Sequence, residues 1–133
     1  MELNPELKKI IRSSAFEIIK GTFIYARVNQ IPKDKHFMVA TDGSEITVVT
    51  EESRLNELDV VERNKDNYSL IALIVSVPFY SVGFLATVSG AIAEAGMNIL
   101  IVSTYSRDYI IVKKDVTQKI KNILLSLGFQ EKA

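Results

Sequence analysis

The residues best suited to chemistry lie where a helix is predicted to begin, immediately after Ser81. Ser81 can cap this helix, and the backbone N–H groups of residues 81–85 have no carbonyl partner within it. These N–H groups carry positive partial charge, so the start of the helix favours a carboxylate or another anion. The α-carboxylate of an amino acid would fit there.

Residues of a neighbouring turn can complete such a site. Gly83 can let a ligand approach the backbone closely, although a glycine before a helix also serves backbone geometry alone. Asp108, in the polar turn 105–108, can receive the ammonium group of the same ligand, or it can simply bond its own backbone. Ser103 and Thr104 can likewise bind a ligand or bond local backbone.

Residues for other kinds of chemistry are scarce. Cysteine is absent and His36 is the one histidine, so thiolate nucleophiles, histidine acid–base pairs and zinc clusters cannot be built. We interpret His36 as a surface or structural residue. Glu94, Tyr105 and Asp108 are isolated acids or bases without a nucleophile beside them. We therefore predict no enzyme activity, no metal site and no cofactor.

The charge balance bears on partners. Lysine and arginine together number 16, as do aspartate and glutamate, so no general field attracts nucleic acid or an anionic membrane. The longest apolar stretch, Leu70–Phe79, is interrupted by Ser76 and Pro78 and is too short to span a bilayer. The N-terminus has no apolar export segment. We expect a cytoplasmic protein that binds neither nucleic acid nor membranes.

The elements that would position the site are clearest in residues 67–133. Leu70–Val77 is a nearly continuous apolar run, which is typical of a strand buried on both faces. The helix after Ser81 ends at Gly96, a residue suited to a left-handed helix stop. Its predicted inner face consists of Leu85, Val88, Ile92 and Ala95.

A hairpin and a second helix follow. The β-branched runs 98–104 and 109–113 predict two antiparallel strands joined by the polar turn. Apolar residues at helical spacing then predict a helix that stops at Gly128, with a last strand possible after it. The predicted order of this half is βαββα, completed to βαββαβ by that last strand.

Residues 1–66 are mainly β in pattern after a short helix that begins at Pro5. Strands are predicted over 16–19 and 22–28, with Lys20-Gly21 as a hairpin turn between them. Two further runs flank the turn 41–44, whose Asp-Gly pair is the strongest turn signal in the chain. The charged stretch that follows places the internal boundary near residue 66.

The stretch Ser69–Asp115 resembles an ACT domain, of the subgroup that includes the CASTOR-type arginine sensors and many short bacterial proteins. Three segments carry this resemblance: Ser81–Phe84, Ala95–Ile99 and Ser103–Tyr109. The first half is similar to the β-rich, degenerate ACT-like unit that precedes the intact one in these proteins, in Gly21–Val28 and Glu45–Val49.

The resemblance implies an α+β, ferredoxin-like fold in which ACT-like units pair side by side and hold a small ligand beside the glycine loop. Residue by residue, Ser81 and Val82 match the loop whose backbone meets the ligand, and Gly83, followed by Phe84, matches the close-approach glycine. Thr104, Tyr105 and Asp108 match the hairpin segment that contacts it. Residues 78–80 stand where many members place an acidic residue, which leaves the ligand's side chain open.

Together these features predict a regulatory, amino-acid-binding ACT-domain protein without catalytic activity, acting as a homodimer. One alternative is a structural dimerisation module whose pocket is vestigial. Another is an RNA-binding ferredoxin-like domain, since RRMs share the βαββαβ order. The strands of that alternative, 98–104 and 109–113, lack the basic and aromatic RNP pattern.

Overall fold

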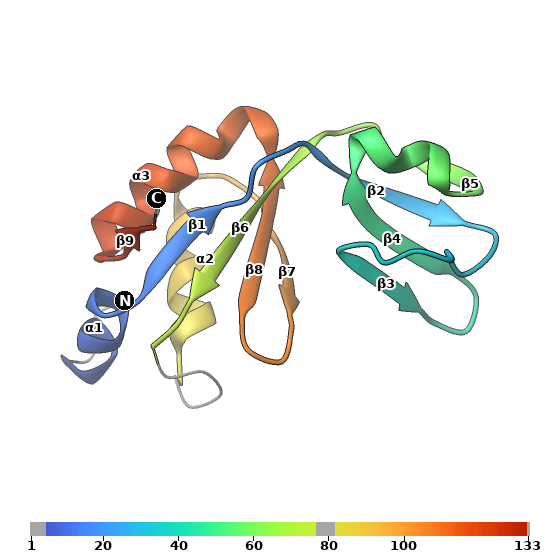
Figure 1. Ribbon diagram of the computed structural model, residues 1–133. Helices are drawn as coiled ribbons and strands as arrows, with labels where there is room; N and C mark the ends of the chain where they lie inside the picture. Colours follow the sequence, from blue (N-terminus) through green and yellow to red (C-terminus); the bar gives the residue numbers. More distant parts are fainter. Residues whose placement is uncertain (1–4, 77–81, 133) are drawn as a thin grey trace. The chain divides into compact units, whose positions relative to one another are not determined.

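The computed structural model describes residues 5–76 and 82–132, and it divides into two compact units (Figure 1). Unit 1 combines the residues up to Ile19 with those from Leu70 onward, and unit 2 comprises Lys20–Ser69. Unit 2 is therefore inserted into the sequence of unit 1. The boundary predicted near residue 66 divides the chain differently, because packing groups the first 19 residues with the C-terminal half.

Unit 1 contains the α+β, ferredoxin-like fold that the sequence predicts. Its strands are β1 (Ala15–Ile18), β6 (Tyr68–Ile74, which begins in unit 2), β7 (Leu100–Ser103), β8 (Asp108–Lys113) and β9 (Gln130–Glu131). Their order across the sheet is β9-β1-β6-β8-β7. Without β1, this is the strand order of a βαββαβ unit. Strand β1 lies between β6 and β9, antiparallel to the first and parallel to the second.

The predicted hairpin with its turn at Lys20-Gly21 is wrong. Strand β1 pairs with β6 and β9, whereas β2 (Phe23–Val28) pairs with β4, β5 and the start of β6. Lys20 and Gly21 thus form the passage from unit 1 to unit 2, and Gly21 takes a φ of 118°, which a glycine adopts without strain.

Three helices share one core with the sheet of unit 1. They are α1 (Pro5–Arg12), α2 (Phe84–Glu94) and α3 (Thr117–Leu127), the last preceded by the short 3₁₀ helix η2 (Lys114–Val116). Alternate residues of each strand point to this face, as the period of a β-strand requires. The buried members of the core are Leu7, Ile11, Phe16, Ile71, Leu73, Phe84, Val88, Ile92, Ile110, Val112, Ile120, Leu124 and Phe129.

Unit 2 is the degenerate counterpart of unit 1. Its strands β2, β3 (Met38–Thr41), β4 (Ile46–Glu51) and β5 (Val60–Arg63) are antiparallel neighbours in the order β5-β2-β4-β3, again the order of a βαββαβ unit. Residues 29–37 contain no helix, and the short 3₁₀ helix η1 (Glu52–Glu57) stands where a second helix would be expected. Its core consists of Ile24, Ala26, Val28 and Val48, with Ile46, Leu55 and Leu58 packed against them.

The Asp-Gly turn between β3 and β4 forms as predicted. One carboxylate oxygen of Asp42 accepts the backbone N–H groups of Ser44 and Glu45, both at 2.8 Å. These hydrogen bonds hold the pKa of Asp42 below its ordinary value. The carboxylate therefore stabilises the fold above its usual pKa, and this contribution is lost as the pH falls through the lowered value.

Candidate functional site

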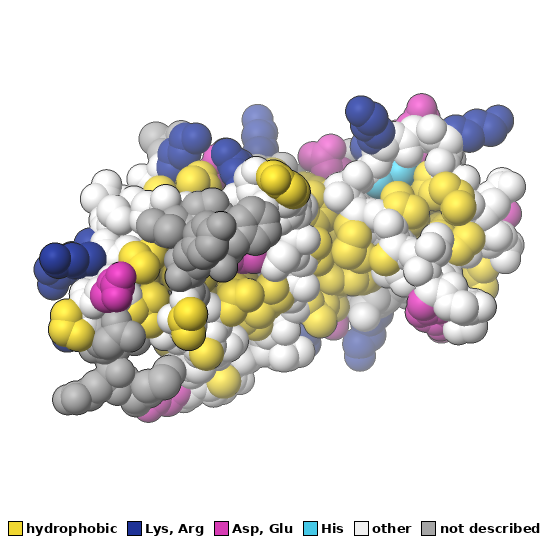
Figure 2. Space-filling model, turned by 90° about the horizontal axis from the view of Figure 1, so that it is seen from below, with side chains coloured by type: hydrophobic (Ala, Val, Ile, Leu, Met, Phe, Trp, Pro, Cys, Tyr) yellow, Lys and Arg dark blue, Asp and Glu magenta, His cyan; other side chains and the backbone are white. Residues whose placement is uncertain are grey.

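The topology brings those predicted site residues that the structure describes to one end of unit 1. In Figure 1, the end of β6, the start of α2 and the tip of the β7–β8 hairpin lie at the same end of the sheet. Figure 2 shows the molecule from below, and hydrophobic side chains of the described residues reach the surface on this face. Among the described residues, Val82 and Tyr105 are the most exposed large hydrophobic side chains, at 91% and 87%.

The start of α2 has the open geometry that anion binding requires. Gly83 is its N-cap with φ 84° and ψ −1°, a left-handed conformation, and no side chain of residues 5–76 or 82–132 caps the helix there. The first helical hydrogen bond runs from the N–H of Thr87 to the carbonyl of Gly83 at 2.9 Å. The N–H groups of residues 84–86 therefore have no acceptor within the helix. Ser81, predicted as the cap, lies outside the described residues, as do Pro78–Tyr80.

Phe84 is in the core rather than at the surface. Its side chain is 2% exposed, and its ring meets that of Phe129 edge to face with 5.7 Å between centroids. Of the predicted site residues, Phe84 can thus offer a ligand only its backbone. The inner face of α2 is correspondingly Phe84, Thr87, Val88 and Ile92, whereas the predicted Ala95 is exposed at the helix end.

Asp108 lies on the helix-covered face of the sheet. Every second residue of a strand points to the same face, so Asp108 shares its face of β8 with Ile110 and Val112. Both of these residues are in the core beneath the helices. Its Oδ1 accepts a hydrogen bond from the hydroxyl of Ser103, its cross-strand neighbour, at 2.5 Å. Within the described part of the chain, its second carboxylate oxygen accepts no hydrogen bond and remains available to a ligand.

Thr104 and Tyr105, the other two predicted residues of the hairpin, have different surroundings from Asp108. The hydroxyl of Thr104 donates to the carbonyl of Arg107 at 3.2 Å, and its N–H donates to the same oxygen at 2.8 Å. Thr104 thus bonds local backbone, as one of the two sequence interpretations had it. Tyr105 lies in the turn at the tip of the hairpin, and its side chain is largely exposed.

Sequence reasoning missed the contribution of α1. A Cβ atom built on Gly83 would lie 3.8 Å from Cδ2 of Leu7, so α1 lines the start of α2. The end of α1 is tied to the end of β6, because the backbone N–H of Ser76 donates to the hydroxyl of Ser14 at 3.1 Å. The sequence predicted a short helix that begins at Pro5, but it did not indicate which loop that helix would meet.

Across residues 5–76 and 82–132, no cluster of three or more histidine, aspartate or glutamate side chains could hold a metal ion. In the same ranges, every helix is too short or too polar to cross a bilayer. The hydroxyl of Thr87, in the first turn of α2, is buried and has no hydrogen-bond partner.

Comparisons with known proteins bear on the family and the fold. Residues 64–126 match the family model of the ACT domain. No curated protein matches the chain. The matched model does not address the CASTOR-type subgroup, which stays a prediction.

Several solved structures share the fold. A protein of unknown function and possible transport protein from Vibrio cholerae has a TM-score of 0.77 and 22% identity, covering 92% of this chain and 96% of its own. A protein from Agrobacterium tumefaciens has a TM-score of 0.70 and 20% identity, covering 90% and 92%. The ligand-free regulatory subunit of aspartate kinase from Thermus thermophilus has a TM-score of 0.59 and 10% identity, covering 86% and 95%.

Proposed function

We propose, from the premise that residues 64–126 form an ACT domain, that this protein is a regulatory binder of a small ligand, an amino acid, with no catalytic activity of its own. The observation that supports this proposal most is the start of α2, where the N-cap Gly83 offers no side chain to the free N–H groups. It lies at the end of the sheet where Asp108 keeps one carboxylate oxygen available. The fold shared with a regulatory subunit of aspartate kinase supports a regulatory role. The cytoplasm stays the proposed compartment.

The proposed binding mode uses both charges of a zwitterion. The α-carboxylate accepts the N–H groups of residues 84–86, where the helix dipole adds favourable potential. The ammonium group donates to Asp108, whose orientation is fixed by the hydrogen bond from Ser103. Regulation then requires that the ligand prefer one of two arrangements of the protein, because equal affinity for both would shift neither.

Binding of the ligand should raise the free energy of unfolding of the protein. An amino acid present at one hundred times its dissociation constant adds about 2.7 kcal/mol to the free energy of unfolding. Thermal unfolding against each amino acid in turn therefore identifies the ligand. If none of them raises the melting temperature, the pocket is vestigial and the chain is a structural dimerisation module instead.

Asp108→Ala should abolish that stabilisation and leave the fold intact. The substitution removes the partner of the ammonium group, whereas the lost hydrogen bond to Ser103 lies at the surface and costs only about 1 kcal/mol. Calorimetric titration measures the binding directly. Asp115→Ala, which removes an exposed carboxylate from η2 in the same unit, is the control and should bind as the wild type does. Unchanged binding by Asp108→Ala would remove this residue from the site.

We also propose that the protein is a homodimer that uses the free edge of β7. This strand pairs only with β8 among the described strands, and both Leu100 and Ile101 are 39% exposed on it. Exposed apolar edges favour association with another strand. Light scattering should give a dimer mass for the wild type and a monomer mass for Ile101→Lys. Leu125→Lys, at a 44% exposed position on α3, should stay dimeric, and a monomeric wild type would contradict the proposal.

A further inference from the structure

The hydroxyl of Thr87 is a buried polar group that lacks a partner. The residue is 6% exposed, and its Oγ1 makes no hydrogen bond in the part of the chain that the structure describes. A helical threonine can turn its hydroxyl back to the carbonyl four residues earlier, but here the carbonyl of Gly83 accepts only the N–H of Thr87, at 2.9 Å. Buried polar groups in native proteins nearly always have a partner, so this hydroxyl needs an explanation.

The position of Thr87 in α2 directs its side chain toward the candidate site. Every Cα–Cβ bond of an α-helix tilts toward the helix N-terminus, so this side chain lies over the turn that begins at Gly83. Thr87 follows Phe84 by three positions, which is about 4.5 Å along the helix axis. Gly83 and Ala86, in the same turn, are exposed. The hydroxyl therefore lies just below the surface, within one turn of the N–H groups proposed to bind the α-carboxylate.

The surroundings of this hydroxyl are apolar. Phe84 and Val88, which share the inner face of α2 with Thr87, are both buried in the core of unit 1. Leu7 of α1 lines the start of the same helix. A charged group that entered here would lose its hydration without gaining a counter-charge. A neutral polar group would lose less, and it would form the hydrogen bond that Thr87 lacks.

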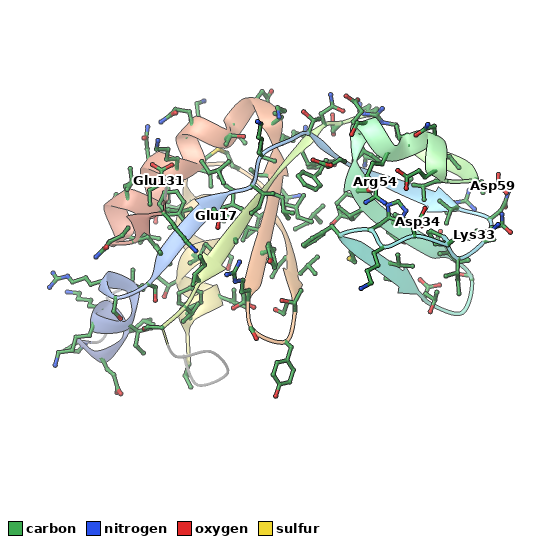
Figure 3. The ribbon with its side chains drawn as sticks, in the orientation of Figure 1. Glu17, Lys33, Asp34, Arg54, Asp59 and Glu131 are labelled. Carbon is green, nitrogen blue, oxygen red and sulfur yellow. The ribbon has the colours of Figure 1, made fainter. Side chains whose placement is uncertain are left out.

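The carboxylates of β1 and β9 do not supply a counter-charge there. Figure 3 shows Glu17 on β1 and Glu131 on β9. Glu131 pairs with Lys121 of α3, with 2.9 Å between Oε1 and Nζ. Glu17 points to the face of the sheet opposite the helices, because Phe16 and Ile18, beside it in the strand, pack in the helix-covered core. Neither carboxylate can therefore neutralise a cation at the hydroxyl of Thr87.

We infer that Thr87 selects the side chain of the ligand, and that this side chain ends in an amide, as in asparagine or glutamine. The inference rests on the proposed function, because it takes the α-carboxylate to be bound at the N–H groups of residues 84–86. An amide side chain extends far enough from the α-carbon to pass along the first turn of α2, whereas the hydroxyl of serine does not. The hydroxyl of Thr87 then donates to the amide oxygen.

Thr87→Val tests the premise without any ligand. Valine has nearly the shape of threonine and replaces a hydroxyl that has no partner, so the melting temperature of the ligand-free protein should stay the same or rise. Thr50→Val is the matched control, because the hydroxyl of Thr50 is also buried but lies 2.8 Å from Nδ1 of His36. That variant should melt at a lower temperature. An equal drop for Thr87→Val would show that Thr87 has a partner within the protein, and it would overturn the inference.

Calorimetric titration of the full chain with asparagine, glutamine, leucine and aspartate tests the selection itself. One of the two amides should bind about tenfold more tightly than leucine, which has no polar group in its side chain, and than aspartate, which has the shape of asparagine and a charge. In Thr87→Val this preference should shrink to about twofold or less. Thr87→Ser keeps the hydroxyl and should keep the preference.

The outcomes separate this inference from the proposed function. If the wild type bound leucine or aspartate as tightly as the better amide, or if Thr87→Val kept the preference, the protein would still bind amino acids but Thr87 would not select them. Asp108→Ala should weaken the binding of all four ligands alike, because each of them carries the same ammonium group. If no amino acid bound to the wild type, the inference and the proposed function would fail together.

Discussion

Replacing Phe16 with alanine should lower the free energy of unfolding of unit 1 by about 3–5 kcal/mol. Phe16 is fully buried in β1 and belongs to the core beneath the three helices. It pairs across the sheet with Leu73 of β6 and with Glu131 of β9. Truncation would leave a cavity between the sheet and the helices that cover it. Since whole domains are stable by about 5–15 kcal/mol, this loss would be large.

Urea unfolding followed by circular dichroism measures the effect of Phe16→Ala. Ile31→Ala, at a side chain that is 64% exposed, is the matched control and should change stability by about 0.5 kcal/mol or less. Amide hydrogen exchange adds a local test, because β6 and β9 should lose protection together. A loss below about 1 kcal/mol for Phe16→Ala would show that β1 is not an integral strand of unit 1.

Much of unit 1 could be predicted because its signals are local. The elements α2, β7, β8 and α3 appear in the predicted order, and both helices stop at the expected glycines. Gly96 and Gly128 take φ values of 81° and 114°, which residues other than glycine rarely adopt. Short windows of about a dozen residues are enough to recognise a helical period, a helix stop or a β-branched run.

The placement of β1 could not be predicted, because the residue pattern within a strand does not show which other strand it pairs with. Residues 16–19 have the composition of a strand, and Lys20-Gly21 suits a turn, so a local hairpin satisfied every nearby signal. The actual neighbours of β1 are distant in sequence: β6 (Tyr68–Ile74) and β9 (Gln130–Glu131). Burying Phe16 and Ile18 against the helices of unit 1 evidently outweighs the local turn.

The sequence predicted the helix start and the hairpin that form the candidate site, and their role in binding stays a prediction. The sequence indicated a helix start beside a hairpin, and the strand register then put Ser103 opposite Asp108 on the core side. Because α2 begins at Phe84, it is Phe84 rather than Leu85 that leads the buried face of the helix. Successive residues point about 100° apart around a helix. This one-residue difference therefore puts the side chain of Phe84 in the core and leaves only its backbone to a ligand.

Gly83→Ala should weaken ligand binding at the start of α2 by tenfold or more. The cause is conformational rather than steric, because a Cβ atom there would make only an ordinary contact with Leu7 at 3.8 Å. A left-handed backbone at φ 84° costs an L-residue about 1–2 kcal/mol. Relaxing that strain rotates the peptide and redirects the N–H groups that the carboxylate needs. Calorimetric titration with the amino acid identified by thermal unfolding measures the loss.

Gly96 provides the matched control, because it ends the same helix with almost the same backbone. Its φ is 81°, and a Cβ atom there would meet nothing within 4 Å. Gly96→Ala should therefore cost the same 1–2 kcal/mol or so in stability while leaving the affinity unchanged. Gly83→Asn should bind better than Gly83→Ala, since asparagine tolerates the left-handed region. If both alanine variants weakened binding equally, the ligand would be sensing the stability of α2 as a whole, and the amides at its start would not be the site.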